Sequence, residues 1–94
     1  MKIPKTLKIG GHTVKVVLVE RVDEHDSDGS WDVDTNTIEI SNKLPQSQKE
    51  ATLIHEILHT LNATWGESHM SHSMLAGTAE QLYQVLADNH LLAR

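Results

Sequence analysis

Large apolar side chains are scarce in this sequence, and their scarcity limits the core that it can form. The 94 residues include no Phe, two Trp (Trp31 and Trp65) and one Tyr (Tyr83). Hydrophobic residues make up 38% of the chain, which is below the usual globular share. We therefore predict one small domain over residues 1–94, with an aliphatic core of Ile, Leu and Val.

A domain of this size buries a modest share of its surface, so a cross-link would help to stabilise it. The chain has no cysteine, which excludes a disulfide, a Cys-type zinc finger and an iron–sulfur cluster. Histidine, in contrast, occurs seven times, against eight Lys plus Arg. If the chain binds a metal, His, Asp and Glu must provide the ligands.

The charge of the chain argues against nucleic acid as a partner, and its hydropathy argues against a membrane. The formal net charge is −5, and the sequence has no cluster of Lys and Arg. Residues 1–5 are basic but lack the apolar run of a signal peptide. No apolar run approaches the about 20 residues that span a bilayer. We expect the cytoplasm as the simplest compartment, and the sequence indicates no oligomeric state.

Two β-hairpins are predicted in the first half of the chain. The first covers residues 6–20, with Gly10 and Gly11 at its turn. Residues 21–30 are polar and acidic, so we expect a solvated loop there rather than a calcium loop. The second hairpin covers residues 31–41, with its turn at 34–36 and strand-like alternation of polar and apolar residues after it.

The hydrophobic period changes to that of a helix after residue 45. Ser47 and Glu50 have the spacing of a capping box, which predicts a helix over residues 48–63. After a loop, a second helix is expected from residue 71 or 72 to residue 91. The order ββββαα predicts an α+β fold, a small antiparallel sheet of about four short strands packed against two helices. The predicted apolar stripes are Ile54, Ile57, Leu58 and Leu61 in the first helix, and Leu75, Ala79, Leu82 and Leu86 in the second.

The first helix contains the motif H-E-x-x-H, formed by His55, Glu56 and His59. Side chains at i and i+4 lie on one face of a helix, so both imidazoles can reach one ion. Zinc accepts such nitrogens at about 2.0–2.1 Å. Glu56 is rotated by about 100° from His55, where it can accept a proton from a water molecule beside the ion. The competing interpretation is a helix that carries two surface histidines and one glutamate.

A third ligand is needed, because a catalytic zinc takes three protein ligands. The extended motif H-E-x-x-H-x-x-G-x-x-H is absent, since Asn62 and Trp65 stand at its Gly and last His positions. His72 is favoured, because it lies at the edge of the apolar stripe of the last helix. Glu80 lies about 120° from the centre of that stripe, towards solvent. The full set of candidates is His69, His72, Glu80 and, remotely, His90. His69 could instead stabilise an oxyanion.

Three stretches of the C-terminal two-thirds resemble the zincin metallopeptidases, and most of all the small phage-type HExxH proteins related to the ImmA/IrrE group. They are residues 31–40 (WDVDTNTIEI), 51–61 (ATLIHEILHTL) and 71–89 (SHSMLAGTAEQLYQVLADN). The resemblance implies zinc ligands at His55 and His59 and a general base at Glu56. The third ligand of that group is usually an acidic residue near the start of the last helix. Here His72 stands near that position, which leaves open a three-histidine site, a shift to Glu80, or a zinc site that cleaves poorly.

The resemblance also implies a function. We expect a zinc metalloendopeptidase, a hydrolase in which Glu56 activates water to cleave a peptide or protein substrate, in the host cytoplasm if the chain is phage-encoded. In zincins the substrate commonly lies antiparallel to the edge strand of the sheet, which would here be residues 37–41. The alternative is a non-catalytic interaction or regulatory module that zinc staples together, with the ion closed off by four protein ligands.

Overall fold

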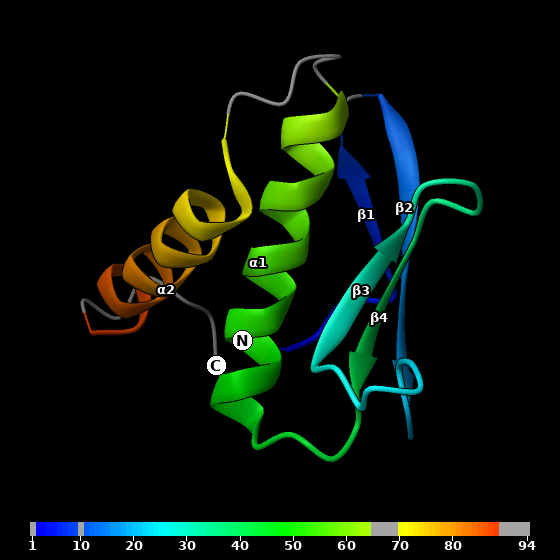
Figure 1. The fold of residues 1–94 in the computed structure, drawn as a ribbon, viewed down its shortest axis with the longest axis horizontal. Helices are drawn as coiled ribbons and strands as arrows, with labels where there is room; N and C mark the ends of the chain where they lie inside the picture. Colours follow the sequence, from blue (N-terminus) through cyan, green and yellow to red (C-terminus); the bar gives the residue numbers. More distant parts are fainter. Residues whose placement is uncertain (1, 10, 65–69, 89–94) are drawn as a thin grey trace.

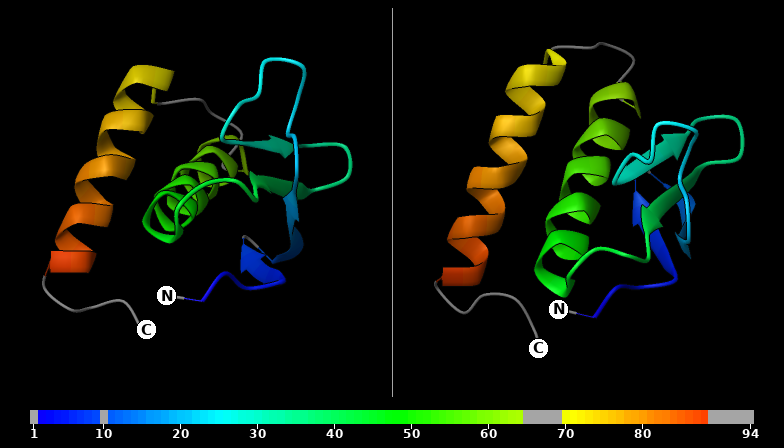
Figure 2. Two further views of the ribbon diagram at one scale, coloured as in Figure 1. Left: turned by 90° about the horizontal axis from the view of Figure 1, so that it is seen from below. Right: turned by 60° about the horizontal axis from the view of Figure 1, so that its bottom comes forward.

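The chain folds into three layers, which Figure 1 shows as a sheet, a helix packed on it, and a second helix on the far side of the first. This computed structural model describes residues 2–9, 11–64 and 70–88. Figure 2 gives the same order of layers from two other directions. The predicted α+β fold of four strands and two helices is confirmed. The elements are β1 (Thr6–Ile9), β2 (His12–Val19), β3 (Gly29–Asp32), β4 (Thr37–Ser41), α1 (Gln46–Thr64) and α2 (His72–Asp88).

Both predicted hairpins are present. In the first, β1 pairs antiparallel with β2, and Gly11 adopts a φ of 82° at the turn, a conformation that glycine adopts without strain. In the second, β3 pairs antiparallel with β4, and Asn36 has a φ of 51° at its turn. The second hairpin begins at Gly29, so the first two residues of β3 were wrongly assigned to the preceding loop.

The sheet is mixed, so the prediction of an antiparallel sheet is wrong at one pair of strands. The strand order is β1-β2-β4-β3, and β2 and β4 are parallel. The connection over residues 20–28 places β3 two strand positions away from β2, and the hairpin then returns β4 into the position between them. Because β3 and β4 are antiparallel, β4 must run in the direction of β2.

The position of β4 corrects a second expectation. Residues 37–41 were expected to form the edge strand, but β4 lies between β2 and β3. Its inward side chains Ile38 and Ile40 are both 0% exposed. The most apolar strand of the second hairpin thus takes the interior place, where burial of its side chains is greatest. The edge strand of the second hairpin is β3.

Helix α1 begins at Gln46, two residues before the predicted start. Ser47 therefore lies inside the first turn, and Glu50 does not complete a capping box but is fully buried. Leu53 is 2% exposed and Leu61 is 37% exposed, so the predicted stripe is wrong at its C-terminal end. The reason is that α1 is covered on two sides, by the sheet and by α2, and one stripe does not describe it.

The core is aliphatic, as predicted, and lies between the sheet and α1. Leu44 and Trp31 are among the partly buried residues packed against it. No helix in the described part of the chain is both long and apolar enough to cross a bilayer. The buried residues of this core are Ile9, Val14, Val16, Ile38, Ile40 and Leu53.

Candidate metal centre

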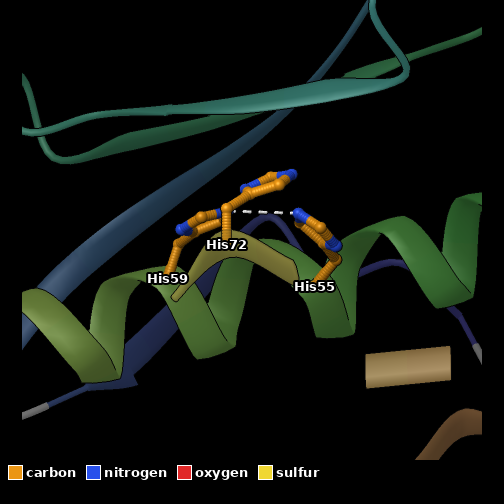
Figure 3. Close-up of side chains that lie close together, drawn as sticks. All are labelled: His55, His59 and His72. Atoms are coloured by element: carbon orange, nitrogen blue, oxygen red, sulfur yellow. Dashed lines mark hydrogen bonds between the residues drawn. The ribbon is translucent and has the colours of Figure 1, made fainter. Parts of the chain in front are cut away.

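Three imidazole rings meet over α1, as Figure 3 shows. His55 and His59 lie one turn apart on α1, and their Nε2 atoms are 3.1 Å apart. His72, the first residue of α2, extends to the same point. Its ring centre lies 5.4 Å from that of His55 and 5.2 Å from that of His59. The sequence pattern and the fold thus bring together the two histidines of the motif and the favoured third residue.

Local hydrogen bonds fix the start of α2 beside α1. The side chain of Asn62 accepts a hydrogen bond from the backbone N–H of Met70 at 3.3 Å and donates one to the Met70 carbonyl oxygen at 3.2 Å. Ser71 then caps α2, because its Oγ accepts a hydrogen bond from the N–H of Met74 at 3.2 Å. These contacts set where the helix begins, and His72 is its first residue.

The spacing of His55 and His59 fits zinc. Two imidazole nitrogens at about 2.05 Å from a tetrahedral ion would be separated by about 3.3 Å. The observed separation of 3.1 Å between the Nε2 atoms of His55 and His59 is close to this value. A ligand atom of His72 completes a group in which all three atoms lie within 4.8 Å of one another. Three imidazole nitrogens from two helices are a donor set that suits zinc.

Burial keeps the two histidines of α1 in the form that binds metal. It lowers the pKa of His55, and nearby His72 lowers it further, while the carboxylate of Glu80 opposes the shift. Burial likewise lowers the pKa of His59, with His55 and His72 adding to the effect. A lowered pKa favours the neutral imidazole, and only a deprotonated ring nitrogen can act as a ligand.

Glu56 is buried next to this cluster. Its side chain is 6% exposed, and burial raises the pKa of its carboxyl group to about 7. A carboxyl group with this pKa can both accept and donate a proton near neutral pH. Its position one residue after His55 directs it to the strand side of α1, where it lies near Gly29 of β3.

A cavity of about 590 Å³ lies beside the cluster. The loop before β3 forms part of its wall, and Asp23 holds that loop together. The carboxylate of Asp23 accepts hydrogen bonds from the N–H groups of His25 and Ser27, both at 3.0 Å, and from the Ser27 hydroxyl at 2.7 Å. These bonds to Ser27 lower the pKa of Asp23. The lining is formed by residues 27–31, by Ala51, Thr52, His55, Glu56 and His59 of α1, and by His72 and Glu80 of α2.

The remaining candidates lie in different places. Glu80 lines the same cavity but is not part of the group of three convergent ligand atoms. His69 and His90 lie outside the described residues. His12 and His25 are exposed.

Two features of the site were not expected from the sequence. Gly29 packs so closely on α1 that an added Cβ would lie 2.6 Å from Cγ2 of Thr52. A glycine at the start of a strand was the available signal, and close backbone approach is one of its usual reasons. Glu50 and Tyr83 form the second feature, a hydrogen bond of 2.9 Å from the Tyr83 hydroxyl to the Glu50 carboxylate. The Tyr83 side chain is half-buried.

Comparisons with protein-family models, with curated proteins and with solved structures found no match for this chain.

Proposed function

We propose that this protein is a zinc-dependent metallopeptidase of the HExxH type. One observation carries the proposal: His55, His59 and His72 converge from two helices beside the buried carboxyl group of Glu56, at an open cavity. The likeness to the zincins, and to their phage-type members in particular, belongs to this proposal and rests on the sequence stretches that carry it. The expected cytoplasmic location is likewise part of the proposal.

In this proposal the three histidines hold the ion, and Glu56 moves the protons. Bound zinc would polarise the carbonyl group of the substrate and make water more acidic. Glu56 accepts a proton from the attacking water and returns it to the nitrogen of the departing amine. The position of the Glu56 carboxyl group, buried next to the three histidines, suits a group that must do both in one cycle.

The substrate proposed is a peptide or protein segment in an extended conformation. The cavity is bordered by β3, which is an edge strand of the sheet, so its outer side can pair with an added strand. This replaces β4 as the strand expected to bind the substrate. The chain offers a shallow site, because α1, α2 and β3 with its preceding loop provide all the cavity lining within the described residues.

The second candidate is a non-catalytic module in which zinc staples α2 to α1. It is favoured by the position of His72, since an ion held by all three histidines would join the two helices. It is disfavoured by the number of ligands. A structural zinc site is normally closed by four protein ligands, whereas the described residues supply a convergent group of three.

Substitution of Glu56 separates the two candidates. Glu56→Gln should bind one zinc per chain, as the wild type does, but should cleave peptides at least about 100-fold more slowly, because the proton acceptor is lost. Zinc content is measured by elemental analysis, and cleavage by mass spectrometry on a defined peptide library. The control is Glu20→Gln, which alters an exposed glutamate and should leave both quantities unchanged.

Cleavage by Glu56→Gln at the rate of the wild type would remove Glu56 from the mechanism. If the zinc-loaded wild type cleaves no peptide in the library, the stapled module is the better account.

A further inference from the structure

The attachment of α2 to the rest of the molecule rests on a few specific contacts. Of the elements in the described part of the chain, α1 is the one with extensive contacts to α2. The buried apolar residues of α2 are Leu75 and Ala79, which are 0% and 2% exposed. One turn later Leu82 is already 40% exposed, so apolar packing covers the first half of the helix better than the second.

Polar side chains hold α2 near each of its ends. At the start, Asn62 of α1 makes two hydrogen bonds to the backbone of Met70, at 3.2 and 3.3 Å. In the second half, the Tyr83 hydroxyl donates a hydrogen bond of 2.9 Å to Oε1 of Glu50 on α1. We call these the Asn62 clasp and the Tyr83 clasp. They lie on either side of the buried pair Leu75 and Ala79 along the chain.

The Tyr83 clasp has a fully buried acceptor. Glu50 is 0% exposed, and its other oxygen accepts a hydrogen bond from Nε2 of Gln46 at 3.1 Å. A buried carboxyl group needs donors, because leaving it without them costs the free energy of its lost hydration. The hydrogen bond from the Tyr83 hydroxyl therefore helps to satisfy Glu50 in this placement of α2.

The same placement decides where His72 lies. His55 and His59 share α1, so their separation is fixed by one helix, whereas His72 depends on how α2 sits on α1. We propose that Asn62 and Tyr83 are positioning residues for the metal centre, which hold α2 so that His72 meets the two histidines of α1. The proposal rests on the metal site of the proposed function, but not on its peptidase activity.

Zinc affinity in a double-mutant cycle tests the proposal. Tyr83→Phe keeps the ring and removes the hydroxyl, and Asn62→Ala removes both hydrogen bonds to Met70. Tyr83→Phe should weaken zinc binding about three- to tenfold, which corresponds to one lost hydrogen bond, and Asn62→Ala, which removes two, should weaken it at least as much. In a His72→Ala background the same substitutions should change the affinity by less than about twofold, since they act through His72.

The control is Gln81→Ala, which alters an exposed residue of α2 and should change the affinity in neither background. Affinity is measured by competition with a chromophoric zinc chelator, and circular dichroism checks that each variant is folded. Unchanged affinity in Tyr83→Phe and Asn62→Ala would overturn the proposal, and so would equal losses with and without His72. Those results leave the metal site itself intact, whereas failure of the wild type to bind zinc would overturn both the proposed function and this inference.

Glu50→Gln provides a second test of the Tyr83 clasp, which can be used if Tyr83→Phe does not fold. It replaces the carboxyl group by an amide of the same size, which keeps an oxygen that can accept the Tyr83 hydrogen bond. We expect it to bind zinc within about threefold of the wild type. A loss as large as that of His72→Ala would contradict the role of this hydrogen bond.

Discussion

At the scale of single residues, burial acts on the acid and on the bases of the site in opposite directions. It raises the pKa of Glu56 and lowers the pKa values of His55 and His59. All three shifts favour the uncharged form, because each group loses hydration in the fold. These three groups therefore carry less charge near neutral pH than they would in water.

The raised pKa of Glu56 predicts how the stability of the metal-free protein depends on pH. The folded state binds the proton of this group more tightly than the unfolded chain, whose pKa is near 4.5. Stability from Glu56 is thus fully present below pH 4.5 and is lost as the pH rises towards about 7. Glu56→Gln avoids that loss, so it should be more stable than the wild type by about 1–3 kcal/mol at pH 8.

Urea denaturation with a chelator present measures this difference. The gap between Glu56→Gln and the wild type should shrink to under about 1 kcal/mol at pH 5, where the buried carboxyl group is protonated. The histidines titrate in both proteins, so the comparison isolates Glu56. A gap that is constant from pH 5 to pH 8 would show that burial does not penalise the charge of this carboxyl group.

At the scale of elements, the close approach of β3 to α1 forms one side of the site. Gly29 pairs with Ile40, and a Cβ atom added to Gly29 would point towards α1. An added Cβ would lie 2.6 Å from Cγ2 of Thr52 and 3.0 Å from the carbonyl oxygen of Glu39. Because Thr52 is a short, β-branched residue of α1 whose side chain has little freedom to move aside, β3 and α1 would have to move apart.

Gly29→Ala should therefore destabilise the protein by about 1–3 kcal/mol, the usual cost of overpacking. The matched control is Gly77→Ala in α2, where an added Cβ meets nothing within 4 Å. That change should stabilise the protein by up to about 1 kcal/mol, since alanine favours a helix more than glycine does. Urea denaturation of both variants checks the pair, and equal effects in the same direction would contradict the packing argument.

The same scale explains what the sequence could and could not predict. Local spacing of residues, which can be read directly from the sequence, predicts the hairpins and both helices. It also predicts that His55 and His59 converge. The parallel pairing of β2 with β4 depends on which strand best fills an interior place, which is a property of the whole sheet. The roles of Glu50 and Gly29 depend on contacts with distant parts of the chain, so spacing alone assigned Glu50 to a capping box and Gly29 to a loop.

At the scale of the whole molecule, the aliphatic core lies on one side of α1 and α2 lies on the other. An ion shared by His55, His59 and His72 would join α2 to the layer that carries the core. Metal bound by the folded state alone stabilises that state by mass action. A bound metal would thus add to the stability that the small core provides.

Removal of the metal should lower the melting temperature. With free zinc at about 100 times its dissociation constant the folded state gains about 2.7 kcal/mol, which corresponds to a rise in Tm of about 10 °C or more for a chain of this length. Calorimetry with zinc and with a chelator measures the shift, and His72→Ala at the same zinc concentration should show a much smaller one. Equal Tm values for the zinc-loaded and chelated wild type would contradict the link between the metal and the fold.

The central claim is that three histidines from two helices hold one zinc ion, and the zinc affinities of His72→Ala and Glu80→Ala test it most directly. Loss of a residue that hydrogen-bonds to a zinc ligand already weakens zinc binding about 10–100-fold. His72→Ala removes a ligand itself, so it should weaken binding by at least about 100-fold. Glu80→Ala removes a carboxylate that lines the cavity outside the convergent group, and it should weaken binding less than about threefold. The reverse order of the two affinities would assign the third ligand to Glu80 and contradict the account.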